Sequence, residues 1–436
     1  MTGRRETVGV LDALSAGSFV WVIVGPMSND DVSTILPRLR AIAERGPLNR
    51  VGLQPEEDSL AWEFDPEITD RYLAAPADAD VTDPSAALTS LLSRKPGAPI
   101  VATFQDGYLL IGLDHGIGDG GVMIELMAAL GAQSPPAGGF VDPVPPATTN
   151  TALMSVLRNA VVSEPLAISK DIGAMTSGAI QGALGRLSER LTSGADTDDA
   201  PPLRRQRVDP SSGTTRVAAA WAGSTPGYLH ELKAWRDVEA PGASLSSLMF
   251  YCIWRGLREY GVHVMDDVNI LVDLRRYLPK DAGTLGNLAG IATIALPDCA
   301  IRPGAFGEAV RAELESTRLL ARTTAAATIR RMGAHRSLRG IGEPAHGRPR
   351  LILSDVTRLP ASAKLSWRQD GQKIFAVALP PGSSQHISVC MTNAGGTIQF
   401  AATFSPDIAD PERVRAGLAR ALTIPTDSIA SEERVG

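Results

Sequence analysis

The sequence predicts an α/β protein built from two lobes, and three observations lead to this fold class. The chain has 436 residues, which is long for a single ordinary domain. Segments with strand periodicity and segments with helical periodicity are mixed in both halves, as in α/β folds. Proline-rich and polar stretches separate the halves. We therefore expect an N-terminal lobe over 1–150, a helical and flexible linker over 151–213 and a C-terminal lobe over 214–436.

In the first lobe, apolar runs of strand length alternate with segments that have one apolar face at helical spacing. A hairpin is expected to turn at Gln105-Asp106-Gly107, because aspartate and glycine favour a tight turn between antiparallel strands. The expected elements are a strand over 18–25, a helix over 28–46 capped by Ser28 or Asn29, a short helix over 87–94, a hairpin over 99–115 and a helix over 120–132.

The second lobe has the same mixed pattern. Its strands are expected from runs rich in valine, isoleucine and aromatic residues, and its helices from apolar spacing and end signals. The expected strands are 214–223, 268–279, 286–297, 349–359, 373–380, 385–393 and 396–405. The expected helices are 226–237, 244–261, a long one over 306–332 and one that begins near Pro411.

Composition and charge exclude several classes of function. The net charge is −6 at pH 7, which does not indicate a nucleic-acid partner. No apolar window of about twenty residues is present for a membrane span, and Asp12 interrupts the first apolar run, unlike an export signal. The three cysteines, Cys252, Cys299 and Cys390, form no CxxC pair. We therefore expect no disulfide framework, no metal site and a cytoplasmic location.

The stretch HGIGDGG at 115–121 allows two interpretations. Its glycines fit G-x-G-x-x-G, the spacing of a dinucleotide-binding loop, which requires a second strand ending in an acidic residue about twenty residues later. Asp142 lies near that distance but among prolines, which exclude a central strand. The other interpretation is a histidine at a strand end, His115, with an aspartate, Asp119, in the following turn.

The histidine interpretation has a direct chemical meaning. The pKa of an unperturbed imidazole is close to cytosolic pH, so a histidine facing a cleft can remove a proton from a hydroxyl or amine. The glycines let the chain fold back tightly, so Asp119 can point away from the cleft. A buried carboxylate needs a partner, and arginine suits it. The alternative for Asp119 is a turn aspartate bonded to its own backbone.

Several segments together carry a resemblance to a known family. The segments are HGIGDG at 115–120, VDLRRYLPKDAGTLGN at 272–287, LILSDV at 351–356 and GPLNRVGL at 46–53. In these features, over nearly its whole length, the chain resembles the chloramphenicol acetyltransferase-like superfamily of CoA-dependent acyltransferases. That superfamily includes nonribosomal-peptide condensation domains, plant BAHD acyltransferases, wax ester synthases and polyketide-associated acyltransferases. The resemblance implies a two-lobed fold with an active-site tunnel between the lobes.

The resemblance also implies roles for single residues. His115 would be the general base, and Asp119, Gly120, Arg275 and Asn287 would support the site structurally, with Arg275 as the ion-pair partner of Asp119. Arg276 is the alternative partner, but as the next residue of a strand it would face the opposite way. Ser354 is a candidate for holding the donor or stabilising an oxyanion.

The implied function is transfer of an acyl group from a thioester to a hydroxyl or amine in lipid or natural-product biosynthesis. The chain departs from its relatives in two features. Asp114 stands where condensation domains and wax ester synthases carry a first histidine, and the BAHD sequence Asp-Phe-Gly-Trp-Gly is absent. Two alternatives therefore remain: a condensation-type protein that uses carrier-bound substrates, and a non-catalytic scaffold or binding protein that kept the fold.

An arginine cluster between 318 and 350 is a candidate binding site for the acyl donor. It contains eight arginines and, near its end, one acid, Glu343. Arg330, Arg331 and Arg336 are candidates for binding the phosphates of CoA or the acidic surface of an acyl carrier protein, since a guanidinium pairs well with phosphate. The alternative is a solvated surface. CoA or a phosphopantetheine thioester is thus expected as co-substrate, with no permanent cofactor and a small-molecule or lipid acceptor. Peripheral contact with a membrane is compatible with this reading.

Overall fold

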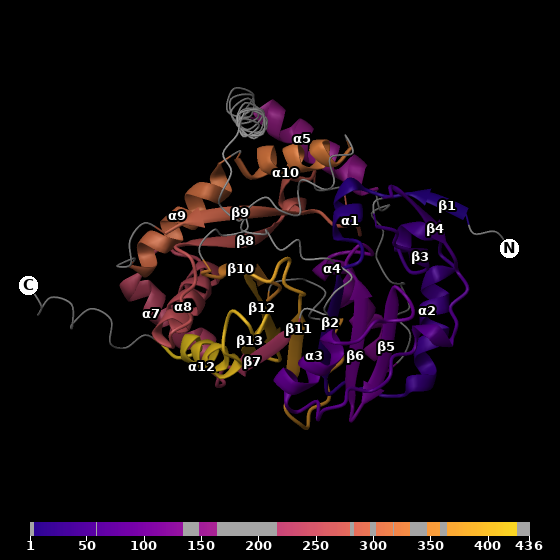
Figure 1. The fold of residues 1–436 in the computed structure, drawn as a ribbon, viewed down its shortest axis with the longest axis horizontal. Helices are drawn as coiled ribbons and strands as arrows, with labels where there is room; N and C mark the ends of the chain where they lie inside the picture. Colours follow the sequence, from indigo (N-terminus) through magenta and orange to yellow (C-terminus); the bar gives the residue numbers. More distant parts are fainter. Residues whose placement is uncertain are drawn as a thin grey trace, which may run out of the picture.

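The computed structural model describes residues 4–57, 59–133, 148–163, 216–279, 283–296, 302–316, 318–331, 347–357 and 364–424. These residues form two lobes that lie side by side (Figure 1). The first lobe, in indigo and purple, occupies the right of that view, and the second lobe, in orange and gold, the left. Each lobe is built around its own sheet, and each sheet has its own cluster of buried apolar side chains.

The sheet of the first lobe has four antiparallel strands in the order β11-β2-β6-β5. Three of them are close to their predicted positions: β2 (Phe19–Gly25), β5 (Ile100–Gln105) and β6 (Tyr108–Asp114). The turn between β5 and β6 has positive φ at both Asp106 and Gly107 (52° and 83°), as a two-residue hairpin turn requires. The predicted hairpin is therefore confirmed, and every residue of β6 is buried.

Helices and a second, smaller sheet surround these strands. The smaller sheet has the order β1-β4-β3. The remaining elements of the first lobe are β1 (Arg4–Thr7), α1 (Val10–Ser15), η1 (Val32–Thr34), α2 (Ile35–Ala43), η2 (Pro47–Asn49), β3 (Leu53–Gln54), β4 (Ala61–Phe64), η3 (Asp70–Tyr72), α3 (Pro84–Leu92) and α4 (Gly120–Gly131). The cap predicted at Ser28 or Asn29 is wrong: the turn η1 begins after Asp31, whose side chain accepts from the Ser33 amide, and α2 follows it.

The sheet of the second lobe has six strands in the order β7-β13-β12-β10-β8-β9. It is mixed, because β10 runs parallel to both β8 and β12 while the other pairs are antiparallel. The strands are β7 (Ala218–Gly223), β8 (Asp267–Asp273), β9 (Ala289–Ala295), β10 (Arg350–Asp355), β12 (His386–Ala394) and β13 (Thr397–Phe404). The helices are α5 (Thr149–Ser163), α7 (Tyr228–Glu239), α8 (Leu245–Glu259), α9 (Pro303–Glu315), α10 (Arg318–Arg331) and α12 (Pro411–Ala421).

Two predicted elements of the second lobe differ from the structure. The strand predicted over 268–279 ends at Asp273, and residues 274–277 form a short 3₁₀ helix, η4 (Leu274–Tyr277). The Asp273 carboxylate accepts from the Arg275 amide and so starts this turn. The single long helix predicted over 306–332 is two helices, α9 and α10. Ser316 has an extended backbone, and its hydroxyl donates to the Glu313 carbonyl, ending α9.

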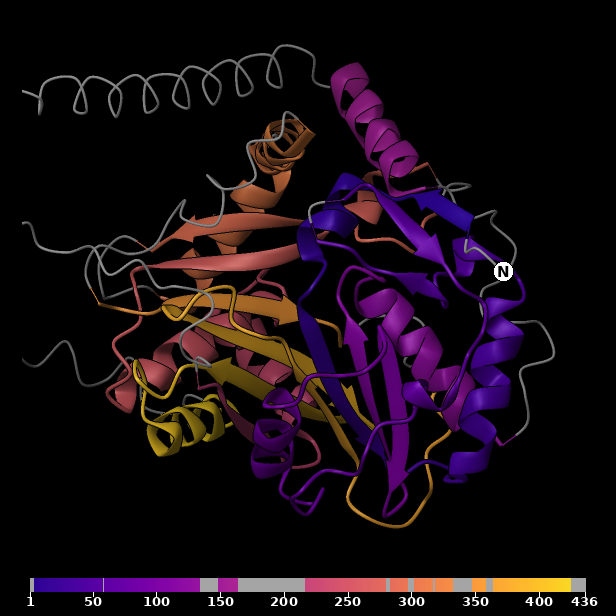
Figure 2. The same cartoon turned by 45° about the vertical axis from the view of Figure 1, so that its right-hand side comes forward.

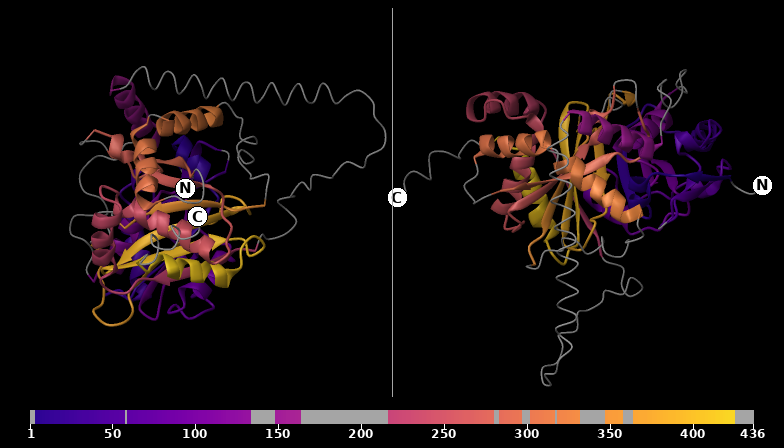
Figure 3. Two further views of the ribbon diagram at one scale, coloured as in Figure 1. Left: turned by 90° about the vertical axis from the view of Figure 1, so that its left-hand side faces the viewer. Right: turned by 90° about the horizontal axis from the view of Figure 1, so that it is seen from above.

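Strand β11 (Ile374–Ala378) links the lobes. It comes from the C-terminal part of the chain, yet it pairs with β2 in the sheet of the first lobe. Figures 1 and 2 show this gold strand beside the indigo and purple strands, and Figure 3 shows the gold strands between the lobes from above. On the other edge of β11, side chains of the second sheet form hydrogen bonds to its backbone. The Phe375 amide donates to Gln399, and the Thr392 hydroxyl donates to the Phe375 carbonyl.

Candidate active site

A cavity of about 440 Å³ lies where the two lobes meet. This volume is in the range of small-molecule sites, about 300–1,000 Å³. His115, Asp119 and Gly120 line it from the first lobe, and Arg275 and Ser354 line it from the second. Most of its other wall residues are apolar, among them Leu113, Val122, Met123, Leu271, Val356 and Val377. The structure thus brings together five of the residues selected from the sequence.

His115 stands directly after the last residue of β6. Because side chains alternate along a strand, Leu113 and His115 face the cavity, whereas Asp114 is absent from its lining. The His115 Nδ1 atom is buried and has no hydrogen-bond partner among the residues that the structure describes. This leaves Nε2 as the ring nitrogen available to a substrate.

The loop that carries His115 is held by its backbone. The His115 amide donates to the Ser18 carbonyl at 2.7 Å, and the His115 carbonyl accepts from Asn287 Nδ2 at 2.7 Å. The next two carbonyls, of Gly116 and Ile117, both accept from the guanidinium of Arg50. Three successive carbonyls are therefore fixed by two side chains, which limits the motion of a loop rich in glycine.

Asp119 combines both of the roles considered for it. Its Oδ1 atom accepts from the Gly121 amide at 3.1 Å and so caps α4. Its Oδ2 atom lies 2.7 Å from Arg275 Nη1 and also accepts from the Leu288 amide. Arg275 is thus the ion-pair partner of Asp119, as expected. It belongs to the 3₁₀ helix η4, so its orientation does not depend on the alternation of side chains along a strand. The guanidinium of Arg276, the alternative partner, lies over the Tyr277 ring. Burial alone would lower the pKa of Arg275, but Asp119 and Asp273 together raise it, so the guanidinium stays charged.

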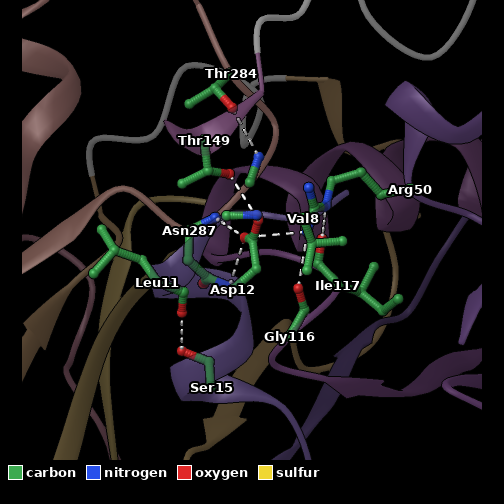
Figure 4. A network of polar contacts seen from close by, with 12 residues as sticks. Val8, Leu11, Asp12, Ser15, Arg50, Gly116, Ile117, Thr149, Thr284 and Asn287 are labelled. Carbon is green, nitrogen blue, oxygen red and sulfur yellow. Dashed lines mark hydrogen bonds and ion pairs between the residues drawn. The ribbon is translucent and has the colours of Figure 1, made fainter. Parts of the chain in front are cut away.

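A second charged pair, Asp12–Arg50, lies beneath the loop (Figure 4). Both residues are buried, with Arg50 Nη2 3.1 Å from Asp12 Oδ1. Asp12 also accepts from the Asn287 amide at 2.8 Å and from the Thr149 hydroxyl at 2.8 Å. Asn287 therefore joins the His115 carbonyl to this buried carboxylate, and the network connects α1, α5 and both lobes.

Asp12, Arg50 and Thr149 were not expected at the site from the sequence. Two signals were present in the sequence. Asp12 interrupts an apolar run, and a charge in such a run is costly unless it is paired. Arg50 belongs to GPLNRVGL, one of the segments of the family resemblance. Neither signal identifies the partner, because Asp12 and Asn287 are 275 residues apart in the chain.

Asp114 is a buried residue that stabilises the loop. It stands where condensation domains and wax ester synthases carry a first histidine. Its carboxylate accepts from the amides of Gly116 at 2.8 Å and Gly17 at 3.0 Å. Burial raises the pKa of Asp114 to about 6, and the charge of Glu57 adds to this effect, while the two amides and His115 oppose it. The side chain therefore anchors the loop from the side opposite to the cavity.

The arginine cluster is described only in part. Arg330 and Arg331 belong to α10, but their side chains, and Arg336 as a whole, lie outside the described residues. The described arginines of the cluster are paired with acids from outside it: Arg318 and Arg322 with Glu313, Arg348 with Asp266 and Arg350 with Asp267. Their charge is thus largely compensated, and none of them lines the cavity.

Two features are absent from the described part of the chain. It contains no cluster of three or more histidine, cysteine, aspartate or glutamate side chains that could hold a metal ion. It also contains no helix with the length and apolar character needed to cross a membrane.

Solved structures share this architecture, whereas no protein-family model and no curated protein sequence matches the chain. The condensation domain of the monacolin K polyketide synthase MokA is 12% identical, with a TM-score of 0.54, and the match covers 97% of this chain and 96% of that one. TRI101 of F. sporotrichioides, solved with coenzyme A and T-2, is 15% identical, with a TM-score of 0.52 and coverages of 95% and 97%.

The nonribosomal peptide synthetase FmoA3 is a third match, 14% identical with a TM-score of 0.53. The match covers 98% of this chain but only 43% of FmoA3, so the chain spans less than half of that protein. These similarities establish the architecture: the chain has the two-lobed chloramphenicol acetyltransferase-like fold. The fold expected from the family resemblance is confirmed. At these identities the likeness extends to the fold alone.

Proposed function

We propose that the chain transfers an acyl group from a thioester to a hydroxyl or amine, with His115 as the general base. The observation that carries this proposal is the position of His115 in the interlobe cavity, on a loop whose carbonyls are held by Asn287 and Arg50. The fold adds support, because similar structures include a polyketide-synthase condensation domain and a protein solved with coenzyme A.

The reaction would take place in one transfer step. His115 Nε2 removes the proton of the acceptor as its oxygen or nitrogen attacks the thioester carbonyl. The tetrahedral intermediate then expels the thiolate, which recovers the proton from the imidazolium. Ser354, which lines the cavity from the second lobe, is our candidate donor to the developing oxyanion. No carboxylate supports Nδ1 in the described residues, so the orientation of the ring depends on the backbone contacts of the loop.

A covalent acyl-enzyme is not required by this site. Cys390 also lines the cavity, but burial raises the pKa of its thiol to about 12, with Asp355 adding to the effect. A thiol in this state is a poor nucleophile, because the thiolate is the reactive form. This supports direct transfer between the two substrates.

The test is turnover of a panel of acyl-CoA and carrier-bound acyl thioesters with hydroxyl and amine acceptors. We expect His115→Ala to lower turnover by about 10²–10⁴-fold with an unchanged fold by circular dichroism. His230→Ala, on the exposed side of α7, is the matched control and should be fully active. Equal activity of both variants would remove His115 from the mechanism. Absence of turnover with every pair would favour a binding protein that kept the fold.

The place where the donor enters is tested with the arginine cluster. We propose that Arg330, Arg331 and Arg336 attract the phosphates or the acidic carrier surface. Salt should weaken this attraction, because the screening length is about 8–10 Å at physiological ionic strength. Reversal of all three to glutamate should raise the Michaelis constant for the donor and leave that for the acceptor unchanged. If the affinity for the donor changes neither with salt concentration nor in the triple glutamate variant, the donor enters elsewhere.

A further inference from the structure

The cavity has a second polar feature, Asp355, in the wall formed by the second lobe. Asp355 is the last residue of β10 and lines the cavity together with Ser354 and Val356. Its Oδ2 atom accepts from the hydroxyl of Ser246, in the first turn of α8, at 2.5 Å. Its Oδ1 atom accepts from the amide and the hydroxyl of Thr357 at 2.9 and 2.6 Å.

Among the residues that the structure describes, Asp355 differs from the other carboxylates of the cavity in having no cationic partner. Asp119 and Asp273 both pair with Arg275, and Glu125 pairs with Lys364 at 2.9 Å. The contacts of Asp355 in the described part of the chain are the hydroxyl and amide donors of Ser246 and Thr357. The lining thus holds four carboxylates, and three of them share two cations, Arg275 and Lys364, so the cavity has an excess of negative charge to which Asp355 contributes.

The surroundings of Asp355 favour an electrostatic interaction with a ligand in the cavity. Three hydrogen-bond donors, one of them in the first turn of α8, hold the carboxylate in place. The wall around it is apolar, with Val272, Val356, Val377 and Leu379. In such a setting a charge is weakly screened, so it attracts a ligand of opposite charge more strongly than an exposed carboxylate does.

We propose that Asp355 binds an ammonium group of the acceptor, so that the acceptor is an amino-bearing small molecule. The proposed function enters this proposal at one point only: the acceptor carries, besides the ammonium at Asp355, a hydroxyl or neutral amine that lies at His115. The ammonium cannot itself be the nucleophile, because its nitrogen has no free electron pair. Asp355 is therefore a specificity-determining residue, separate from the base.

The experiment measures binding, which does not require turnover. Calorimetry compares hexylammonium with 1-hexanol, two probes of similar length that differ in charge, at low ionic strength. We expect the wild-type protein to bind hexylammonium about tenfold or more tightly than 1-hexanol, the effect of one charge-assisted contact. Asp355→Asn keeps an oxygen and an amide for Ser246 and Thr357 but removes the charge, and it should abolish the preference.

Two further variants separate charge recognition from structural effects. Glu125→Gln removes a carboxylate of the same cavity that is already paired with Lys364, and it should leave the preference unchanged. Ser246→Ala removes the short hydrogen bond but keeps the carboxylate, and it should also retain the preference. The proposal is overturned if wild-type protein shows no preference for the cation or does not bind it, or if Asp355→Asn retains the preference.

The same ligands distinguish this proposal from the proposed function. His115→Ala should bind both probes as the wild-type protein does, because it lacks the base but not Asp355. If His115→Ala retains full turnover while Asp355→Asn loses the cation preference, the assignment of the base fails and the ammonium site stands. If His115→Ala loses turnover while Asp355→Asn binds both probes like the wild type, the base stands and the ammonium site fails.

Discussion

Single residues restrain the loop that carries His115. Its glycines give the chain little intrinsic rigidity, and the restraint comes from Asn287 and Arg50, which bind three successive carbonyls. Arg50 itself is fixed by the buried carboxylate of Asp12. The geometry of His115 therefore depends on residues that do not line the cavity.

The Asp119–Arg275 ion pair predicts a measurable loss of stability. Asp119 is 14% exposed, so the pair is partly buried, and Asp119→Ala should cost roughly 2–3 kcal/mol, below the about 3–5 kcal/mol of a fully buried pair. Asp273→Ala removes the more exposed partner of the same guanidinium and should cost only about 1 kcal/mol. Urea denaturation measures both, and equal costs would contradict the role given to Asp119.

Asp114 predicts a particular pH dependence of stability. Burial raises its pKa to about 6 from the ordinary 3.8, so the folded state binds the proton more tightly than the unfolded state. Stability should therefore fall as pH rises from about 4 to 6, by at most about 1.4 kcal/mol per pH unit, and then level off.

Asp114→Asn provides the comparison, because the amide does not titrate. The free energy of unfolding of the variant, minus that of the wild type, should increase between pH 4 and 6 and stay constant above pH 7. Other titrating groups contribute equally to both proteins and cancel in this difference. Parallel stability profiles across this range would show that Asp114 titrates normally.

At the scale of elements, helix α3 closes the open edge of the second sheet. Strand β7 pairs with β13 on one side only, and an open edge exposes unpaired amides. The amides of Ala219 and Trp221 donate at 2.9 Å to the hydroxyls of Thr89 and Ser85 on α3. Two hydroxyls of the first lobe thus take the place of a neighbouring strand.

Removal of these two hydroxyls should weaken the interface between the lobes. Ser85→Ala combined with Thr89→Val leaves both β7 amides without an acceptor, and each unsatisfied group costs about 1–3 kcal/mol. We expect a clear decrease in melting temperature. Ser90→Ala, on the same helix, removes a hydroxyl that bonds to Asp78 within the first lobe, and its melting temperature should stay close to the wild type. Similar shifts in both variants would argue against the edge contact.

At the scale of the whole molecule, the lobes share structure and not only a surface. Strand β11 pairs with β2 in the first sheet, while Gln399 and Thr392 of the second sheet bond to its other edge. The cavity is lined from both lobes. Separation of the lobes would therefore destroy a sheet edge and the candidate site together.

This arrangement predicts that both lobes unfold in one transition. Scanning calorimetry should give a single peak whose calorimetric and van't Hoff enthalpies agree, the criterion for cooperative unfolding. Asp119→Ala should move the whole peak to lower temperature. Two resolved transitions, with only one of them shifted by the substitution, would show that the lobes are independent units.

The sequence by itself determined the features that depend on local chemistry. Apolar periodicity located most strands and helices, and Asp106-Gly107 located the hairpin because both residues tolerate the positive φ that its turn requires. The family resemblance carried by the sequence selected His115, Asp119, Arg275 and Asn287, of which the first three line the cavity and the fourth holds the His115 carbonyl. The break between α9 and α10 was missed, because Ser316 ends the helix through a single side-chain hydrogen bond.

Only the tertiary structure decided which distant groups meet. The partners of Asp12 come from residues 137 and 275 positions away, and no local pattern encodes such a pairing. The same holds for β11, whose sequence fits a strand in either sheet, and for Asp355, whose contacts in the described part of the chain are with the distant Ser246 and with Thr357. Periodicity reports which side of an element is buried, whereas the identity of the neighbour depends on how the whole chain packs.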